Sequence, residues 1–108
     1  MDTIQFDLSL EEAAQGFAAM GSEARLQVVL TLVRAGSEGL TVGEIQEKTG
    51  MAASTLAHHL RFLTSAGLVD QKKYGRTICN RAVYDRLEVL ASYILKECCA
   101  DDPEHCGD

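Results

Sequence analysis

Three of the four cysteines of this chain lie within nine residues at its C-terminal end. Cys98, Cys99 and Cys106 belong to the stretch KECCADDPEHCGD, which also holds five acids and one histidine. Thiols gathered in this way bind soft metals and metalloids, oxidise reversibly or, with His105 as a fourth ligand, hold zinc in a Cys3His site. Which chemistry applies depends on the part of the chain that carries these cysteines.

The length and composition indicate one domain over residues 1–108, with residues 96–108 as its C-terminal tail. A chain of 108 residues, 46% of them hydrophobic, builds one compact core. The N-terminal stretch MDTIQFDLSLEE has acids where a secretion signal has bases, and no apolar run approaches the roughly 18 residues that span a membrane. We therefore expect a cytoplasmic protein without membrane contact. In that reducing compartment a cysteine cluster is more often a metal site or a reactive thiol group than a disulfide.

The acidic balance of the whole chain hides a basic middle. The formal net charge is -6, but residues 54–86 hold six bases and two acids and so carry +4. Proteins that bind nucleic acids concentrate their basic residues on one surface. The net charge therefore does not exclude DNA as a partner, and a local basic surface is expected.

Capping residues and apolar periodicity predict five helices. Ser9 with Glu12 and Thr41 with Glu44 form capping boxes, which predict helices over about residues 10–20 and over VGEIQEKT. Other helices are expected between Ser22 and the AGSEG break, within MAASTLAHHLRFLTSAG, and over about residues 84–99.

The same periodicity predicts which faces are apolar. The first helix has the stripe Leu10, Ala13, Ala14, Phe17 and Ala18. The second, expected to be central to the core, has Leu26, Val29, Leu30 and Val33. The last has Leu87, Leu90, Ala91, Ile94 and Leu95. The first and last stripes exceed what one small core needs, so these two helices are expected to form a homodimer.

Two short helices followed by a basic hairpin are the pattern of a winged helix-turn-helix, in which the second helix enters the major groove. LVDQKK and RTICNRA, which flank the turn pair Tyr74-Gly75, form the hairpin. The expected fold is thus mainly α with a small β-hairpin. The fourth helix offers side chains for phosphates and base edges: Ser54, Thr55, His58 and Arg61. The hairpin offers cations for phosphates: Lys72, Lys73, Arg76 and Arg81.

The paired histidines and the remaining cysteine also invite a metal or thiol assignment. Adjacent helix residues point about 100 degrees apart, so His58 and His59 are not expected to share an ion, and His59 is expected near the edge of the core. Cys79 lies in the middle of a predicted strand and is expected to be a small buried side chain.

The stretches FAAMGSEARLQVV, LTVGEIQEKTGM, STLAHHLRFLTSAGLV and GRTICNR resemble the ArsR/SmtB family of metal-responsive bacterial repressors. The resemblance covers about residues 15–83 and rests on the order and spacing of Gly21, Arg25, Gly50, His59, Leu60, Gly67 and Leu68. It implies a homodimer that binds palindromic operator DNA and releases it when a metal or metalloid binds. Ala52 and Ala57 stand where the family commonly has Ser, so its base contacts at those sites are not expected to carry over.

The resemblance also offers several sensing sites. VGEIQEKT lacks the cysteine pair that one arsenic-sensing branch carries in that helix, and the last helix lacks the Asp, His and Glu ligands of the zinc-sensing branch. Cys98, Cys99 and Cys106 resemble another arsenite-sensing branch, with an adjacent cysteine pair at the end of the last helix and a third cysteine several residues on.

Charge ranks the possible ligands. Arsenous acid is neutral, and its reaction with three thiols releases three waters and leaves a neutral As(Cys)3 unit, whereas zinc bound by three thiolates is an anion. The surrounding acids and the negative end of a helix dipole disfavour that anion, and also the low-pKa thiols of an oxidation sensor. These acids are Glu97, Asp101, Asp102 and Glu104.

The sequence thus predicts a dimeric transcriptional repressor induced by trivalent arsenic. Other thiophilic inducers stay open, namely methylarsenite, antimonite, Hg(II), zinc or thiol oxidation, and so does a zinc-stabilised winged-helix module that binds proteins. An enzyme is not expected. Arsenate reduction needs an arginine six residues after the reactive cysteine, but Asp85, Glu104 and His105 stand six residues after Cys79, Cys98 and Cys99.

Overall fold

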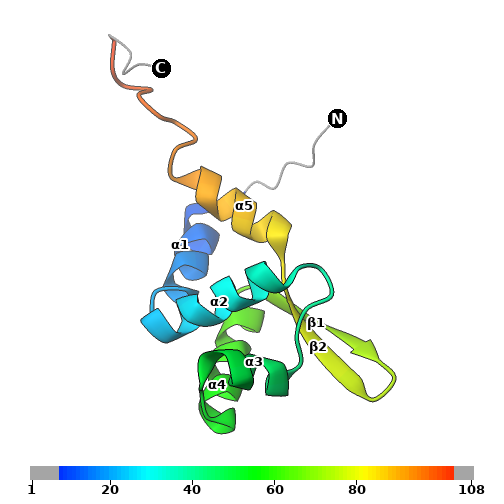
Figure 1. Cartoon of the computed structure of the whole chain (residues 1–108). Coiled ribbons are helices and arrows are strands. Elements are labelled where there is room, and N and C mark those ends of the chain that lie inside the picture. The colour runs from blue at the N-terminus through cyan, green and yellow to red at the C-terminus, as the bar shows by residue number, and fades with distance from the viewer. Residues whose placement is uncertain (1–7, 104–108) are drawn as a thin grey trace.

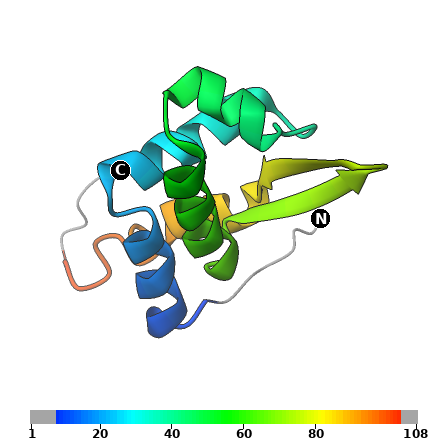
Figure 2. The same ribbon diagram turned by 90° about the horizontal axis from the view of Figure 1, so that it is seen from below.

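The protein is described by a computed structural model for residues 8–103. Its elements are α1 (Leu10–Ala19), α2 (Glu23–Ala35), α3 (Val42–Thr49), α4 (Ala53–Ser65), β1 (Val69–Tyr74), β2 (Thr77–Ala82) and α5 (Tyr84–Tyr93). In Figure 1, α1 and α5 lie together at one end, α3 and α4 form the other end, and the hairpin projects from the side. Seen from below, α4 faces the viewer with the hairpin beside it (Figure 2). The expected winged helix-turn-helix architecture is confirmed.

Side-chain caps set the starts of three helices. Ser9 and Glu12 form a reciprocal capping box at α1, as Thr41 and Glu44 do at α3, and both confirm the prediction from sequence. The Ser22 hydroxyl accepts from the amide of Arg25 at the start of α2. Helix α4 begins differently, because Ala52 occupies its N-cap position and makes no side-chain cap.

The core joins one face of α4 to α1, α2, α3, the hairpin and α5. Its α4 face consists of Leu56, Leu60 and Leu63, as the sequence predicted. The predicted buried face of α2 is wrong in phase. Leu26, Leu30 and Val33 are exposed, and of the predicted set only Val29 is buried. The buried face consists instead of Val28, Val29, Thr31 and Leu32.

The hairpin is tied to the body through Asn80, which is fully buried. The backbones of Leu40 and Asn80 exchange hydrogen bonds of 2.9 and 2.7 Å, and the Asn80 side-chain amide also donates to the Leu40 carbonyl. Gly39 precedes this bridge, and a Cβ at Gly39 would collide with the Asn80 carbonyl. The strands pair from Val69 with Ala82 to Tyr74 with Thr77.

The hairpin turn lies one residue later than the sequence predicted. Because Tyr74 pairs with Thr77, the turn consists of Gly75 and Arg76, and Tyr74 belongs to the strand. Gly75 has a φ of 62°. Positive φ at the first turn residue is the feature for which type II′ hairpins use glycine.

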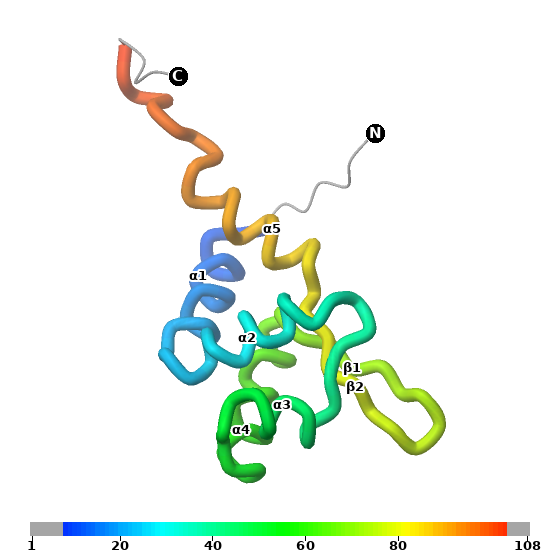
Figure 3. Tube along the Cα trace, in the orientation of Figure 1, coloured from blue at the N-terminus to red at the C-terminus, as the bar shows by residue number. Residues whose placement is uncertain are grey.

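Helix α5 ends at Tyr93, earlier than the predicted end near residue 99. Beyond it the backbone continues in tight turns, with hydrogen bonds from each amide to the carbonyl three residues earlier at Leu95, Lys96, Cys98, Ala100 and Asp102. Figure 3 shows this segment leading away from the body. The apolar residues Ile94 and Leu95, predicted as part of the helical seam, are 68% and 66% exposed.

Candidate DNA-binding surface and cysteine site

The outward face of α4 carries the four residues predicted to read DNA. Ser54, Thr55, His58 and Arg61 are all exposed, and they lie opposite the buried leucines of the same helix. Ser54, His58 and Arg61 follow one another at spacings of four and three, so they form one stripe along the helix. The structure therefore gathers small hydrogen-bonding groups, an imidazole and a guanidinium on one open surface.

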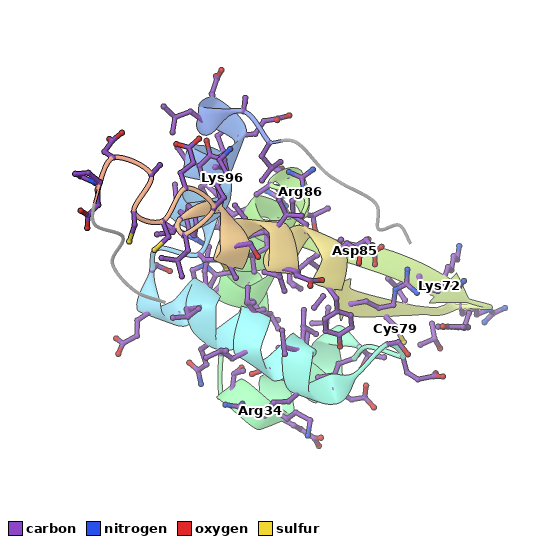
Figure 4. All side chains as sticks on the ribbon, turned by 90° about the horizontal axis from the view of Figure 1, so that it is seen from above. Arg34, Lys72, Cys79, Asp85, Arg86 and Lys96 are labelled. Atoms are coloured by element: carbon purple, nitrogen blue, oxygen red, sulfur yellow. The ribbon has the colours of Figure 1, made fainter. Side chains whose placement is uncertain are left out.

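The four hairpin cations do not form a single patch. Register places Lys72 and Arg81 on one face of the hairpin together with Cys79, and Lys73 on the opposite face, while Arg76 lies in the turn. Figure 4 shows Lys72 and Cys79 on the projecting hairpin. Cys79, expected to be buried, is half-buried and has a free thiol.

Arg81 is already engaged by an acid. Its Nε and Nη2 donate to the two carboxylate oxygens of Asp70 at 3.0 and 3.2 Å, across a directly paired position of the strands. The hydrogen bond to Asp70 raises the pKa of Arg81 above its ordinary value. Asp70 neutralises much of the field that Arg81 presents to a phosphate, and the prediction from sequence missed this partner.

A contact between α2 and α4 also escaped the sequence analysis. The Arg25 guanidinium lies 4.7 Å from the centroid of the Phe62 ring, and the His58 ring meets the same ring edge-on at 5.1 Å. Next to them, His59 is half-buried, as expected, and its Nδ1 atom is buried without a hydrogen-bond partner. Burial, followed by the charges of Arg25 and His58, lowers the pKa of His59 below 6.5.

The adjacent cysteines follow the end of α5. The Sγ atoms of Cys98 and Cys99 lie 3.3 Å apart, which the tight turns allow and an intact helix would not. Cys99 has a φ of 64° and is half-buried, and Cys98 is exposed. Cys98 is a free thiol, whereas Cys99 is disulfide-bonded.

The third predicted thiol ligand, Cys106, lies outside the described residues, as do Glu104 and His105. Within residues 8–103, no group of three or more His, Cys, Asp or Glu side chains is placed to hold a metal ion. The three-cysteine site therefore stays a prediction. No described helix is long and apolar enough to cross a membrane.

Two regulators of known sequence are related to this chain. Residues 20–72 match the family model for a helix-turn-helix domain. The uncharacterized HTH-type transcriptional regulator YceK of Bacillus subtilis is 39% identical over 64 residues, which cover 59% of this chain and 63% of that protein, somewhat less than two thirds of its length. The HTH-type transcriptional regulator YgaV of Escherichia coli is 34% identical over 74 residues, 68% of this chain and 73% of that protein.

Solved structures place the fold more narrowly. An ArsR-like transcriptional regulator from Rhodococcus superposes with a TM-score of 0.70 at 28% identity, over 84% of this chain and 82% of that one. The homodimeric winged helix-turn-helix DNA-binding domain of Mb0332 from Mycobacterium bovis, a possible ArsR-family regulator, gives 0.65 at 28% identity over 89% of each chain. This chain is therefore a member of the ArsR family of winged helix-turn-helix transcriptional regulators.

Proposed function

We propose that this regulator is a dimeric repressor that holds operator DNA until trivalent arsenic binds Cys98, Cys99 and Cys106. The observation that carries the sensing part is the 3.3 Å separation of the Cys98 and Cys99 sulfurs in a segment that no longer forms an α-helix. The DNA-binding part rests on the exposed stripe of α4 and on the hairpin cations.

In the proposed complex α4 enters the major groove and the hairpin flanks it. Ser54, Thr55, His58 and Arg61 then contact phosphates and base edges. Lys72, Lys73 and Arg76 bind phosphates and release counterions, and Arg81 contributes less because of Asp70. The uncapped first turn of α4 adds backbone amides that a phosphate can accept from.

The dimer is proposed to form through α1 and α5. Leu10 on α1 is 75% exposed, and Ile94 and Leu95 just after α5 are 68% and 66% exposed. Because α1 and α5 pack together, these apolar side chains belong to one end of the molecule. Apolar surface of this kind is what a symmetric interface buries, and a structural relative is a homodimer.

The Cys98 and Cys99 sulfurs lie 3.3 Å apart while Cys99 is disulfide-bonded. Arsenic can bind both sulfurs only after this disulfide is reduced, so the proposal concerns the reduced protein. Two thiols this close in the chain then bind one soft centre with little movement of the backbone.

Charge favours arsenic over zinc. Glu97, Asp101 and Asp102 flank the cysteine pair in the sequence, and all three are exposed. In the reaction As(OH)3 + 3 RSH → As(SR)3 + 3 H2O, three S–H protons leave with the three hydroxyl groups as water, and no electron is transferred. The product is neutral, so the neighbouring carboxylates do not oppose it as they oppose an anionic zinc thiolate.

Arsenic binding would act through the dimer. The site follows α5 directly, so closing Cys106 onto the pair changes the segment that adjoins the proposed interface. A change in the angle between the subunits moves the two α4 helices away from half-sites one helical turn apart. By linkage, DNA must weaken arsenic binding by the same factor as arsenic weakens DNA binding.

Direct binding to the reduced protein tests the ligand set. We expect wild type and Cys79→Ser to bind one arsenite per subunit with equal affinity, because Cys79 lies on the hairpin. Cys98→Ser, Cys99→Ser and Cys106→Ser should each weaken inorganic arsenite binding by at least tenfold. Wild-type affinity in Cys106→Ser would contradict the three-thiol site and favour two thiols that bind methylarsenite.

Thiol oxidation is the second candidate signal, because Cys99 is disulfide-bonded in the structure. It predicts that peroxide releases the wild-type protein from DNA without arsenic, and that a thiol reductant restores binding. Release by arsenite in the presence of excess reductant would exclude oxidation as the required signal.

A further inference from the structure

Arg25 occupies the junction of three helices. It lies in the first turn of α2, where its backbone amide donates to the Ser22 hydroxyl at 3.0 Å. Its side chain extends from there in the direction of α1 and α4 together. Arg25 belongs neither to the proposed DNA contacts nor to the proposed cysteine site.

One side of the guanidinium binds the end of α1. Its Nε donates to the Ala19 carbonyl at 2.6 Å, and its Nη2 lies 3.5 Å from the Ala18 carbonyl. The last carbonyls of a helix lack helical partners and carry the negative end of its dipole, so a fixed cation is favourable there. Ala19 is buried, which makes this hydrogen bond costly to lose.

The same guanidinium lies over an aromatic ring of α4. It lies 4.7 Å from the centroid of Phe62, within the range of cation–π attraction. Phe62 is 47% exposed, so the leucine core fixes it only in part. Phe62 in turn meets His58, one of the proposed DNA-contacting residues, edge-on at 5.1 Å.

We infer that Arg25 is a positioning residue that fixes the orientation of the recognition helix α4 relative to the dimerisation helix α1. This inference rests on the dimer of the proposed function. If α1 belongs to the interface, the orientation of α4 relative to α1 sets the separation of the two α4 helices in the dimer. Arg25 then determines how strictly the protein requires one spacing of operator half-sites.

Arginine suits this role and lysine does not. The guanidinium presents several donors in a rigid plane, so it can bond carbonyls while its charge lies over a ring. Lysine keeps the charge but offers one compact ammonium, which cannot hold both contacts at once. Arg25→Lys therefore separates the geometry from the charge.

A contact that only stabilises the fold makes a different prediction from one that orients α4. Loss of stability alone leaves the folded molecules with the same helix orientation. Val28→Ala is the matched control, because Val28 lies on the same helix and is fully buried, and its truncation lowers stability without touching the guanidinium contacts. Phe62→Leu removes the other end of the contact.

The direct measurement is the distance between the two α4 helices in the full-length dimer. For this measurement the four native cysteines are replaced by serine. Thr64→Cys, on the exposed side of α4, then supplies the only cysteine for the spin label. Double electron–electron resonance should give a single narrow distance distribution for the labelled Thr64→Cys protein and for the same protein with Val28→Ala. The Arg25→Lys and Phe62→Leu versions should be clearly broader, and the double variant no broader than either. Equal distributions in wild type and Arg25→Lys overturn the inference.

The matching DNA measurement uses an operator selected from random DNA by the wild-type protein. Inserting two base pairs between its half-sites should strongly weaken DNA binding by the wild type and by Val28→Ala. The ratio of the affinities for the original and the lengthened operator should be about tenfold smaller in Arg25→Lys. Equal discrimination in Arg25→Lys and wild type contradicts a positioning role. Failure of the wild type to select any DNA would contradict the proposed function, while the spin-label distances still test Arg25.

Discussion

The recognition helix α4 and the segment after α5 differ in what holds them. On α4, Leu56 and Leu63 are fully buried and Leu60 is nearly so, while the polar stripe faces outward. After α5, Ile94 and Leu95 are two thirds exposed, and the backbone makes only tight turns. One region is thus fixed by the core of its own subunit, and the other has little of that core around it.

This difference suits the two tasks that we assign to these regions. A surface that reads DNA needs side chains held in a fixed geometry before DNA arrives. A segment that senses a small ligand by gathering thiols must change conformation at low cost, which is possible where few buried contacts are lost.

Truncation in the two regions should give the largest contrast. Leu63→Ala should lower the free energy of unfolding by about 2–5 kcal/mol, because it leaves a cavity in the core. Cys98→Ser, at an exposed position, should change it by less than about 0.5 kcal/mol. Urea unfolding at one fixed protein concentration measures both. A loss in Cys98→Ser comparable to that in Leu63→Ala would show that the tail is part of the core.

The hairpin cations should differ in their contribution to DNA binding. Lys72→Gln should weaken operator binding several-fold and reduce the slope of log K against log salt by about 0.9, because one phosphate contact is lost. The double variant Asp70→Asn with Arg81→Gln removes the ion pair without changing the net charge, and should leave that slope nearly unchanged. A reduction equal to that of Lys72→Gln would show that Arg81 contacts a phosphate.

Supplying the missing cap of α4 should change stability by less than Leu63→Ala does, and should raise it instead of lowering it. Ala52→Ser should raise the free energy of unfolding by about 1 kcal/mol, because a serine hydroxyl accepts from the free amides of the first turn. Ala53→Ser, one position inside the helix, is the control and should not stabilise the protein. Thermal unfolding distinguishes them, and equal melting temperatures for wild type and Ala52→Ser would contradict the capping assignment.

The smallest effect concerns His59 and pH. Its folded-state pKa is below 6.5, so as pH falls through 6.5 the unfolded chain takes up a proton that the folded protein does not. Stability should therefore fall as the pH is lowered from 7.5 through 6.5, and it should fall less in His59→Gln. His58→Gln should reduce this fall by less than His59→Gln does, because the charge of His58 is the smallest of the three causes that lower the pKa of His59. Identical pH dependence of urea unfolding in wild type and His59→Gln would contradict the burial of this imidazole.

Local signals predicted the fold well. The capping boxes at Ser9 and Thr41 and the leucine spacing of α4 need only neighbouring residues, and the structure confirms them. The exposed face of α4 followed directly from that spacing.

Features that depend on distant contacts were missed. Helix α2 is apolar around much of its circumference, so its sequence could not show that Val28 and Leu32, and not Leu26 and Leu30, face the core. Nothing in the sequence marks the end of α5 at Tyr93, because the apolar pattern continues past it. The Asp70–Arg81 pair needs the strand register, and the Arg25–Phe62 contact needs the packing of α2 on α4.

The most direct test of the central claim is operator release measured by fluorescence anisotropy with a panel of arsenite, methylarsenite, antimonite, Hg(II), zinc and peroxide. The reduced wild-type protein should release its operator with arsenite at concentrations at which zinc has no effect. Cys98→Ser should bind the operator as tightly as wild type and stay bound when arsenite is added. Release by zinc or peroxide but not by arsenite, or undiminished release of Cys98→Ser by arsenite, would contradict the proposal.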